Sequence, residues 1–248
     1  MLKTAFDVRV VLVRARNPLN IGAAARAMAN FGFRDLALVA PFEAAWQEAR
    51  SAVGAEEVMA AAARFSTLAE ALAGRTLVAG TTTGRRRKLP GGLLPLPDLP
   101  ARIPPGARLA LLFGSEKTGL TNEDLSFCHF ALRIPTVADC PSMNLGQAVA
   151  VCCYELSRGD RPAVCHGQAG RPVTTPATMA EIEQFRGELE EALRAAGYFS
   201  RGHRAGDTEK LRRLLLRLHV SGHDLDALRG MIAQIKWKLD RSDTDEPG

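Results

Sequence analysis

The first two-thirds of the chain alternates short apolar runs with stretches of helical periodicity. Five apolar runs lie at residues 8–13, 36–39, 77–79, 109–113 and 131–134, and their length and continuity are typical of strands buried on both faces. Helical patterns lie between several of these runs. Strands that alternate with helices form parallel sheets covered on both sides, so the pattern predicts an α/β fold.

The helices of this region are predicted from their ends as well as from their periodicity. Asn17 and Pro18 open the first one, because Asn caps a helix and Pro suits its first turn, and Gly32 is placed to end it. Further helices are predicted at residues 46–63, 67–73 and 144–157.

The character of the sequence changes after residue 157, where Gly, Pro, Arg and Ser become frequent and no period persists, which predicts a linker. Helices are predicted again at 178–196, ended by Gly197, at 207–218 and at 224–239. We therefore divide the chain into a domain at 1–157, a linker at 158–176, a helical extension at 177–241 and an acidic tail at 242–248. The extension is too small for a large core of its own, so we expect it to pack on the first domain or on a second copy.

Composition narrows the class of protein. The 248 residues are 46% apolar and 24% charged with a mean hydropathy of -0.05, an ordinary globular composition. No apolar run reaches the length of about 18 residues that a transmembrane helix needs. The first residues carry Lys3, Asp7 and Arg9 and lack the features of a signal peptide, so we expect a cytoplasmic protein without a membrane partner. The five cysteines show no CxxC spacing, which predicts free thiols and no metal site.

The charge balance favours a polyanionic partner without requiring one. The chain has 32 Lys and Arg against 27 Asp and Glu, which gives a net charge of +5. Arg85, Arg86, Arg87 and Lys88 form one dense basic run, and residues 199–241 hold a second surplus. Clustered cations are what phosphate contacts need, yet the same clusters also occur on ordinary solvated surfaces.

Three segments carry candidate chemistry. The first, residues 18–26, begins a helix with small residues among which Asn20 and Arg26 are polar, and such a helix start lets a charged ligand approach backbone N–H groups. Spacing alone favours the interpretation of Arg26 as an exposed helix residue. The second, residues 113–120, follows a strand with a glycine turn at Gly114, but it matches neither the dinucleotide fingerprint nor the P-loop. The third, residues 140–148, leads from a loop into a helix that Ser142 or Asn144 can cap.

The three segments read as NxGxxxR, FGxExxGL and SxN, and in this order and spacing they resemble the SPOUT class of RNA methyltransferases. The resemblance is to the TrmH superfamily of ribose 2′-O-methyltransferases and, within it, to the TrmJ branch. It covers nearly the whole chain, since residues 185–239 are similar to the helical extension of that branch. A nicotinamide enzyme is excluded by the missing glycine fingerprint.

The resemblance implies a fold, a cofactor and a substrate. The fold is a SPOUT-type parallel sheet whose C-terminal part forms a trefoil knot, a rare exception among proteins, followed by a small all-α extension. The implied methyl donor is S-adenosylmethionine, and the implied assembly is a homodimer. The implied substrate is tRNA, methylated on the ribose of the first anticodon-loop nucleotide, conventional position 32, a cytidine or uridine.

The resemblance also assigns roles to residues of this chain. Arg26 matches the catalytic arginine, with Asn20 near it and with Ser142 and Asn144 at the same site. The implied cofactor pocket comprises Thr81, Thr82, Thr83, Gly114, Glu116, Ile134, Pro141, Ser142, Met143 and Leu145. Pro141 departs from the two consecutive serines frequent in the TrmJ branch, and a proline offers no N–H donor.

The chemistry of such a site needs no metal, because a sulfonium methyl is already an activated electrophile. The site must align the ribose oxygen with the methyl group, which supplies about 7–11 kcal/mol in favourable cases, and must help to remove a proton. Arg26 either loses its own proton and acts as a base, or stays charged and stabilises the developing alkoxide. The sequence leaves both versions open.

Under this interpretation, the basic clusters are expected to bind RNA. Arg85, Arg86, Arg87 and Lys88 follow the threonine loop and are expected to flank the cofactor site, while Arg212 and Arg213 in the extension are expected to contact the tRNA backbone. Two alternatives stay open: the same reaction on another tRNA or ribosomal RNA site, and an RNA-binding homologue without catalysis.

Overall fold

A computed structural model describes residues 6–44, 46, 54–83, 92–158, 175–199 and 205–242. The chain divides into two compact units, Met1–Ala169 and Gly170–Gly248. The basic run Arg85–Lys88, most of the predicted linker and nearly all of the predicted acidic tail lie outside the described residues. No described helix combines the length and the apolar character that crossing a membrane requires.

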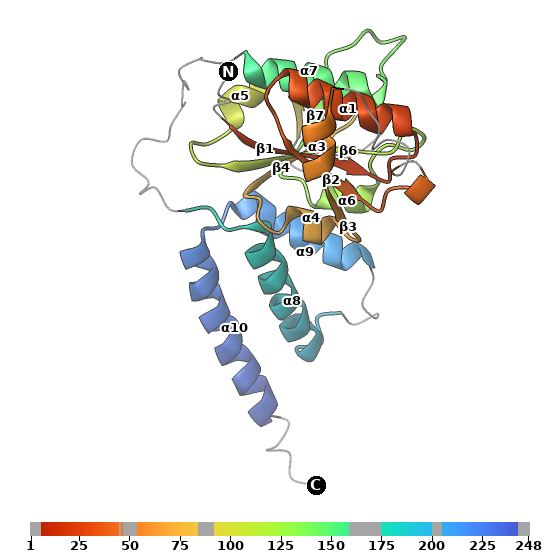
Figure 1. Ribbon diagram of the computed structural model, residues 1–248. Coiled ribbons are helices and arrows are strands. Elements are labelled where there is room, and N and C mark those ends of the chain that lie inside the picture. Colours follow the sequence, from red (N-terminus) through yellow and green to blue (C-terminus); the bar gives the residue numbers. More distant parts are fainter. Residues whose placement is uncertain are drawn as a thin grey trace. The chain divides into compact units, whose positions relative to one another are not determined.

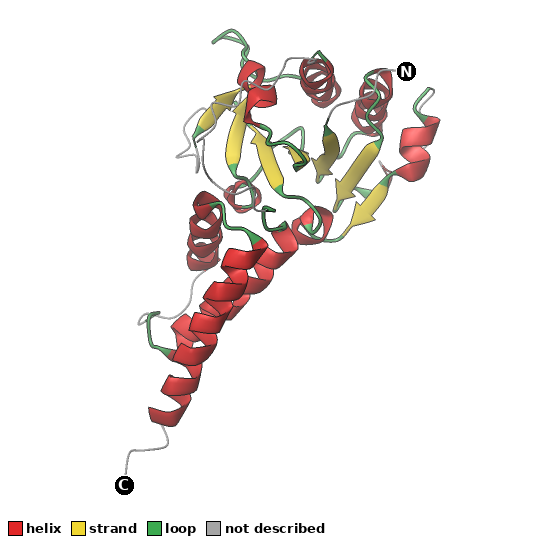
Figure 2. Ribbon diagram, turned by 90° about the vertical axis from the view of Figure 1, so that its left-hand side faces the viewer, coloured by secondary structure: helices red, strands yellow, loops and turns green. Residues whose placement is uncertain are grey.

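The first unit is built on a parallel sheet of seven described strands (Figures 1 and 2). The strands are β1 (Asp7–Val13), β2 (Asp35–Val39), β3 (Ala63–Phe65), β4 (Leu77–Thr81), β5 (Leu93–Pro95), β6 (Arg108–Phe113) and β7 (Phe130–Arg133). Their order is β3-β2-β1-β6-β4-β7-β5, and each paired strand is parallel to its neighbour. The predicted α/β fold with a parallel sheet is therefore confirmed.

The order of the strands positions the loops that matter later. β6 lies between β1 and β4, and β7 lies on the other side of β4. In a parallel sheet the carboxyl ends of neighbouring strands meet at one edge, which is where ligands bind in open α/β folds. The segments that follow β1, β6, β4 and β7 are consequently neighbours, although they are far apart in the sequence.

Alternating side chains of β1 explain why the sheet is covered on both faces. Val8, Val10 and Leu12 belong to one apolar core together with residues of α1 (Pro18–Asn30) and α7 (Leu145–Ser157). Val11 and Val13 are equally buried but lie outside that core. The helices α1 and α7 lie together on one face, and the short helices α4 (Leu68–Leu72) and α6 (Asn122–Ser126) lie on the other (Figure 1).

The two long helices of this unit begin as predicted. The Asn17 side chain accepts a hydrogen bond from the backbone N–H of Leu19 at 2.9 Å, and Asn144 accepts one from that of Gly146 at 2.9 Å. Gly146 also lets α7 approach α1, because a Cβ on it would lie 2.6 Å from the Cβ of Ala23. Both helix starts therefore sit at the carboxyl edge of the sheet, pressed against each other.

One predicted helix is wrong in extent. The pattern predicted a single helix at residues 46–63, whereas α3 covers only Glu56–Ala61 and the chain then enters strand β3. Gly54 turns the chain before α3 with a φ of 74°, a conformation that favours glycine. Strand β5 and strand β3 were not predicted, because three residues are too few for a period and their pairing partners are distant in sequence.

The described part of the second unit is helical, as predicted. Its helices are α8 (Met179–Ala195), α9 (Ala205–Leu218) and α10 (Gly222–Ser242), and α8 packs against both of the others. Thr178 and Glu181 form a capping box at the start of α8. Ion pairs join α8 to α9 through Glu183 and Arg212, and to α10 through Glu191 and Lys236.

Candidate functional site

A cavity of about 530 Å³ opens at the carboxyl edge of the first unit's sheet. Its walls come from the segments that follow β4, β6 and β7 and from the start of α1. The lining residues are Asn20, Thr81, Thr82, Thr83, Phe113, Gly114, Ser115, Glu116, Lys117, Thr118, Gly119, Leu120, Leu132, Ile134, Pro141, Ser142, Met143, Asn144, Leu145 and Ala148. Each of the three candidate segments contributes to this one space.

The structure gathers here all of the predicted catalytic and cofactor residues except Arg26. The ten residues assigned to the cofactor pocket line the cavity, and so do Asn20 and Asn144. Most lining residues that the sequence analysis missed, such as Ser115, Thr118 and Leu120, lie inside the FGxExxGL segment. Taking that whole segment as one loop would have found them.

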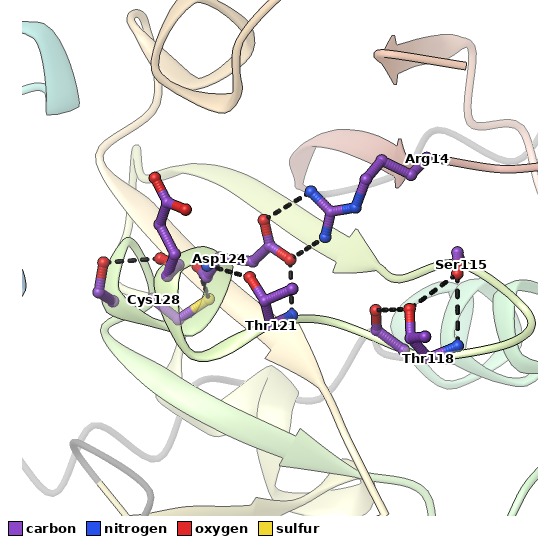
Figure 3. A network of polar contacts seen from close by, with 9 residues as sticks. Arg14, Ser115, Thr118, Thr121, Asp124 and Cys128 are labelled. Carbon is purple, nitrogen blue, oxygen red and sulfur yellow. Dashed lines mark hydrogen bonds and ion pairs between the residues drawn. The ribbon is translucent and has the colours of Figure 1, made fainter. Parts of the chain in front are cut away.

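The FGxExxGL segment forms a tight loop that requires glycine at its first position. A Cβ on Gly114 would lie 2.1 Å from the backbone carbon of Gly119 and from the nitrogen of Leu120. The backbone N–H of Gly119 donates to the carbonyl of Ser115 at 2.8 Å, and the hydroxyls of Ser115 and Thr118 are 3.1 Å apart (Figure 3). The loop therefore folds back on itself and presents backbone to the cavity.

Glu116 ties this loop to the start of α1. Its carboxylate accepts hydrogen bonds from the backbone N–H groups of Arg16 at 3.2 Å and Asn17 at 3.1 Å, and from the Asn20 side chain at 3.0 Å. Burial raises the pKa of Glu116, but these hydrogen bonds and one from its own backbone together bring the pKa below its ordinary value. Glu116 is therefore an ionised side chain that shapes the cavity.

Asn20 and Asn144 join the first segment to the third. The Asn144 amide donates to the Asn20 side-chain oxygen at 2.7 Å, while its own oxygen accepts from the backbone N–H of Gly146. Asn144 thus caps α7 and contacts Asn20 at the same time. Ser142 is exposed at the cavity, and its hydroxyl makes no hydrogen bond to the described residues.

Thr81 and Pro141 also form hydrogen bonds with neighbouring segments of the fold. The Thr81 hydroxyl donates to the carbonyl of Leu112 at 2.8 Å, which links the ends of β4 and β6. The Thr136 hydroxyl donates to the carbonyl of Pro141 at 3.2 Å. Pro141 therefore contributes an acceptor that is already used and no N–H donor.

Arg14, which directly follows β1, holds the segment at the C-terminal end of the 113–120 loop (Figure 3). Its guanidinium donates two hydrogen bonds to Asp124, whose carboxylate also accepts from the backbone N–H of Thr121 at 2.6 Å. Asp124 is only 4% exposed. The loop is consequently held to the segment after β1 twice, by Glu116 in its middle and by Arg14 at its exit.

Arg26 does not line the cavity of its own chain. Its side chain is exposed on α1, and a Cβ on Gly54 would lie 1.1 Å from its Nη1 atom, so the guanidinium lies directly against that glycine. Beside it, a hydrogen bond from the backbone of Gly54 lowers the pKa of Glu56, and the charge of Arg26 adds a smaller effect in the same direction. The expected position of Arg26 beside the donor is therefore not found within one chain.

Arg212 and Arg213, which are predicted to contact RNA, both pair with carboxylates of the helical unit. Arg212 is 6% exposed, and its guanidinium donates to both carboxylate oxygens of Glu183 on α8 at 2.6 and 3.0 Å. Arg213 pairs with Glu209 at 3.0 Å one turn earlier on α9. The burial of Arg212 is at odds with a phosphate contact, because its charge and donors are already taken up inside the helical unit.

Cys152 and Cys153 are buried in the apolar core of the first unit. Burial raises the pKa of Cys153 to about 12 and raises the pKa of Cys152 as well. Thiols in such surroundings stay protonated and unreactive. Within the described ranges, no three His, Cys, Asp or Glu side chains gather in a way that suits a metal ion.

Comparison with known proteins identifies the family. Residues 7–154 match the SpoU rRNA Methylase family. This chain belongs to the SpoU methylase family. Residues 180–245 match a second family, the C-terminal domain of the tRNA methyltransferase TrmJ. The chain is thus a methyltransferase, and the resemblance that the three segments indicated is confirmed.

Relatives extend the similarity over nearly the whole SpoU methylase. The tRNA (cytidine/uridine-2′-O-)-methyltransferases TrmJ of Klebsiella pneumoniae and Escherichia coli K12 are each 36% identical to it, and each alignment covers 93% of this chain and 96% or 95% of the relative. The crystal structure of TrmJ from Z. mobilis ZM4 superposes with a TM-score of 0.77 at 32% identity, covering 92% of this chain and 98% of that one. A probable methylase family protein from Haemophilus influenzae superposes with a TM-score of 0.56 at 29% identity, covering 96% of this chain and 99% of that one.

Proposed function

We propose that this SpoU methylase is an S-adenosylmethionine-dependent tRNA ribose 2′-O-methyltransferase. Its target is the first nucleotide of the anticodon loop, position 32, where it accepts cytidine or uridine, and it works in the cytoplasm as a homodimer. The observation that carries the proposal is the cavity, in which the three family segments converge at the carboxyl edge of a parallel sheet. The relatives named above supply the substrate class.

The residues of the cavity suit an adenosyl sulfonium ligand. Its volume of about 530 Å³ lies within the usual range for small-molecule sites. Ile134, Met143 and Leu145 offer apolar surface, while the 114–120 loop offers backbone groups that no side chain at Gly114 covers. When bound, S-adenosylmethionine supplies the activated methyl group. The chain holds the donor in these loops and excludes water from it.

Support for a trefoil knot comes from the path of the chain. β7 lies beyond β4 as seen from β6, yet α7, which follows β7, packs against α1. Residues 134–144 must therefore cross back along the carboxyl edge, where the 114–120 loop also lies. Threading of one loop by the other is the arrangement that the family resemblance implies.

The position of Arg26 supports a role across two protomers. A guanidinium that lies against Gly54, outside its own cavity, can reach a donor only in a second chain or after a large movement. In the proposed homodimer, Arg26 of one protomer acts at the cavity of its partner and assists removal of the ribose proton. The reacting ribose is held in the donor's cavity by Asn20, Asn144 and Ser142.

Mixed dimers test this arrangement. Arg26→Ala removes the guanidinium but leaves the cavity, and Gly114→Ala disrupts the cavity but leaves Arg26. Each variant alone is expected to be inactive. Mixing them after dissociation should restore about one quarter of wild-type activity, since half of the dimers are mixed and each has one complete site. No recovery in verified mixed dimers would contradict action across protomers.

Methylation of defined transcripts tests the function itself. An unmodified tRNA transcript, the purified enzyme and labelled S-adenosylmethionine should give one methyl group per tRNA, mapped to the ribose of nucleotide 32. A transcript with a 2′-deoxyribose at position 32 is the matched control and should accept none. Methylation at any other nucleotide would contradict the proposed target.

Two alternative functions have distinct outcomes in the same assay. The matched family carries ribosomal RNA in its description, so ribosomal RNA fragments belong among the substrates tested. Methylation of these fragments with none of tRNA would favour that alternative. Failure of the enzyme to bind S-adenosylmethionine in a calorimetric titration would favour an RNA-binding protein without catalysis.

A further inference from the structure

Three cations near the edge of the cavity have no carboxylate partner among the described residues, unlike most described arginines of the first unit. Most described arginines of this unit pair with a carboxylate; the pairs are Arg9–Asp35, Arg14–Asp124, Arg34–Glu57, Arg64–Glu43, Arg75–Asp7 and Arg158–Glu155. Arg16, Lys117 and Arg133 are exposed and have no ion-pair partner among the described residues. Arg102 and Arg108 also have none, but they come from α5 (Leu99–Arg102) and from the start of β6, away from the carboxyl edge.

All three cations lie next to residues that line the cavity. Lys117 lines it directly. Arg133 stands between Leu132 and Ile134, which both do. The backbone of Arg16 donates to Glu116 at 3.2 Å, and Arg16 stands directly before the N-cap of α1, whose residue Asn20 lines the cavity. The three cations therefore come from three different segments that border the cavity.

Arg16 is also held in place by an aromatic ring. Its guanidinium carbon lies 4.4 Å from the centre of the Phe42 ring, and the backbone N–H of Phe42 donates to the carbonyl of Ala15 at 3.1 Å. Phe42 itself is 51% exposed. A guanidinium stacked on a ring keeps its N–H groups free at its edge, where they can bind a phosphate in two places at once.

Arg64 shows that stacking alone does not make such a site. Its guanidinium lies 5.7 Å from the centre of the Trp46 ring, much like Arg16 on Phe42. Arg64 also donates to both carboxylate oxygens of Glu43, at 2.9 and 3.1 Å. Its charge is compensated within the chain, whereas that of Arg16 is available to an anion.

We propose that Arg16, Lys117 and Arg133 form a phosphate-binding rim that holds the RNA backbone beside the target ribose. The proposal rests on the proposed function. A ribose 2′-hydroxyl lies between two phosphodiesters of the same strand, so bringing it to the donor brings phosphates to the edge of the cavity. Cations without carboxylate partners at that edge neutralise them, and Phe42 orders Arg16 before the RNA arrives.

The variant Arg16→Gln tests the rim, with Arg64→Gln as the matched control that removes a stacked but paired arginine. Affinity for an unmodified tRNA transcript is measured over a series of salt concentrations. Loss of one phosphate contact should weaken binding about tenfold at low salt and reduce the slope of log affinity against log salt by about 0.9. Arg64→Gln should change neither, and Arg16→Lys should restore the slope.

Two further measurements separate the rim from a general structural defect. Phe42→Leu should weaken tRNA binding less than Arg16→Gln does, because the charge remains but is no longer ordered. The affinity for S-adenosylmethionine should be the same in wild type and Arg16→Gln, so that the loss falls on the KM for tRNA.

The outcomes separate failure of the rim from failure of the function. An unchanged salt slope in Arg16→Gln, or an equal decrease in Arg64→Gln, would overturn the rim while wild-type methylation of tRNA still stands. A wild-type enzyme that methylates no tRNA would overturn the proposed function, and the rim with it.

Discussion

The basic residues of the helical unit and those beside the cavity of the first unit differ in their partners. In the helical unit, several of them pair with carboxylates on a neighbouring helix: Arg212 with Glu183, Arg229 with Glu188 and Lys236 with Glu191. At the cavity of the first unit, Arg16 and Lys117 have no such partners among the described residues. A count of cations along the sequence therefore does not distinguish those that pair with carboxylates of a neighbouring helix from those that do not.

Glycines of the two units differ in the space around them. Gly114→Ala, in the first unit, should produce the largest effect. The added Cβ would meet the backbone of Gly119 and Leu120 at 2.1 Å, and neither can move without deforming the loop. Affinity for S-adenosylmethionine should decrease about 10- to 100-fold, as measured by calorimetry. A variant that binds the donor normally would show that this loop does not form the donor site.

Arg212→Gln should destabilise the helical unit without weakening the binding of tRNA. The substitution leaves the partly buried Glu183 paired with Arg186 at 3.2 Å and should lower the free energy of unfolding by about 3 kcal/mol. Chemical denaturation measures this loss. The salt dependence of tRNA binding should stay unchanged; a slope reduced by about 0.9 would restore Arg212 as a phosphate contact.

Asp124→Asn tests whether the Arg14–Asp124 ion pair shapes the donor site as well as stabilising the fold. The free energy of unfolding should decrease by about 2 kcal/mol, less than for a fully buried pair because the Arg14 side chain is 38% exposed. The KM for S-adenosylmethionine should also rise, since Asp124 holds Thr121 at the loop's exit.

Asp35→Asn is the matched control for this variant. It breaks the pairs of Asp35 with Arg9 and Arg75 near the other end of β1, away from the cavity. It should lower stability to a similar degree and leave the KM unchanged. Equal changes of KM in the two variants would reduce the Arg14–Asp124 pair to a purely structural role.

Gly230→Ala, in the helical unit, should stabilise the protein, whereas Gly114→Ala should impair its donor site. A Cβ on Gly230 meets nothing within 4 Å, and the residue lies inside α10. Alanine favours helices over glycine, so the free energy of unfolding should increase by about 0.5–1 kcal/mol with no change in activity. Thermal denaturation measures it, and a destabilised variant would show that this side of α10 is not open.

The smallest expected effect is the pH dependence that Glu116 contributes. Folding lowers its pKa below the ordinary value of 4.5, so its ionised form contributes stability above that value. The contribution is lost as the pH falls through the lowered pKa. The stability of wild type should therefore exceed that of Glu116→Gln near neutral pH, and the difference should shrink from about pH 5 downward. A difference independent of pH would mean that Glu116 is not ionised in the folded protein.

Much of the candidate site was readable from the sequence because its parts are contiguous. Asn20 lies in the first turn of α1, the 113–120 segment begins at the end of β6, and residues 141–145 lead into α7. The family resemblance assigned these contiguous segments to one site, and parallel strands bring their carboxyl ends to one edge. The helix expected at 46–63 was wrong in extent, because an alanine-rich pattern does not reveal that Gly54 turns the chain or that residues 63–65 pair with β2.

The sequence by itself determined five of the strands, the longer helices and the cap at Asn17, because periodicity and capping are local properties. The residues of the cavity were assigned by the resemblance of three contiguous segments to a known family. The tertiary structure alone decided which charges are free. Arg212 and Glu183 lie 29 residues apart on different helices, and Arg26 meets Gly54 across a turn. Whether a cation is compensated depends on partners distant in the chain, and no local pattern contains that information.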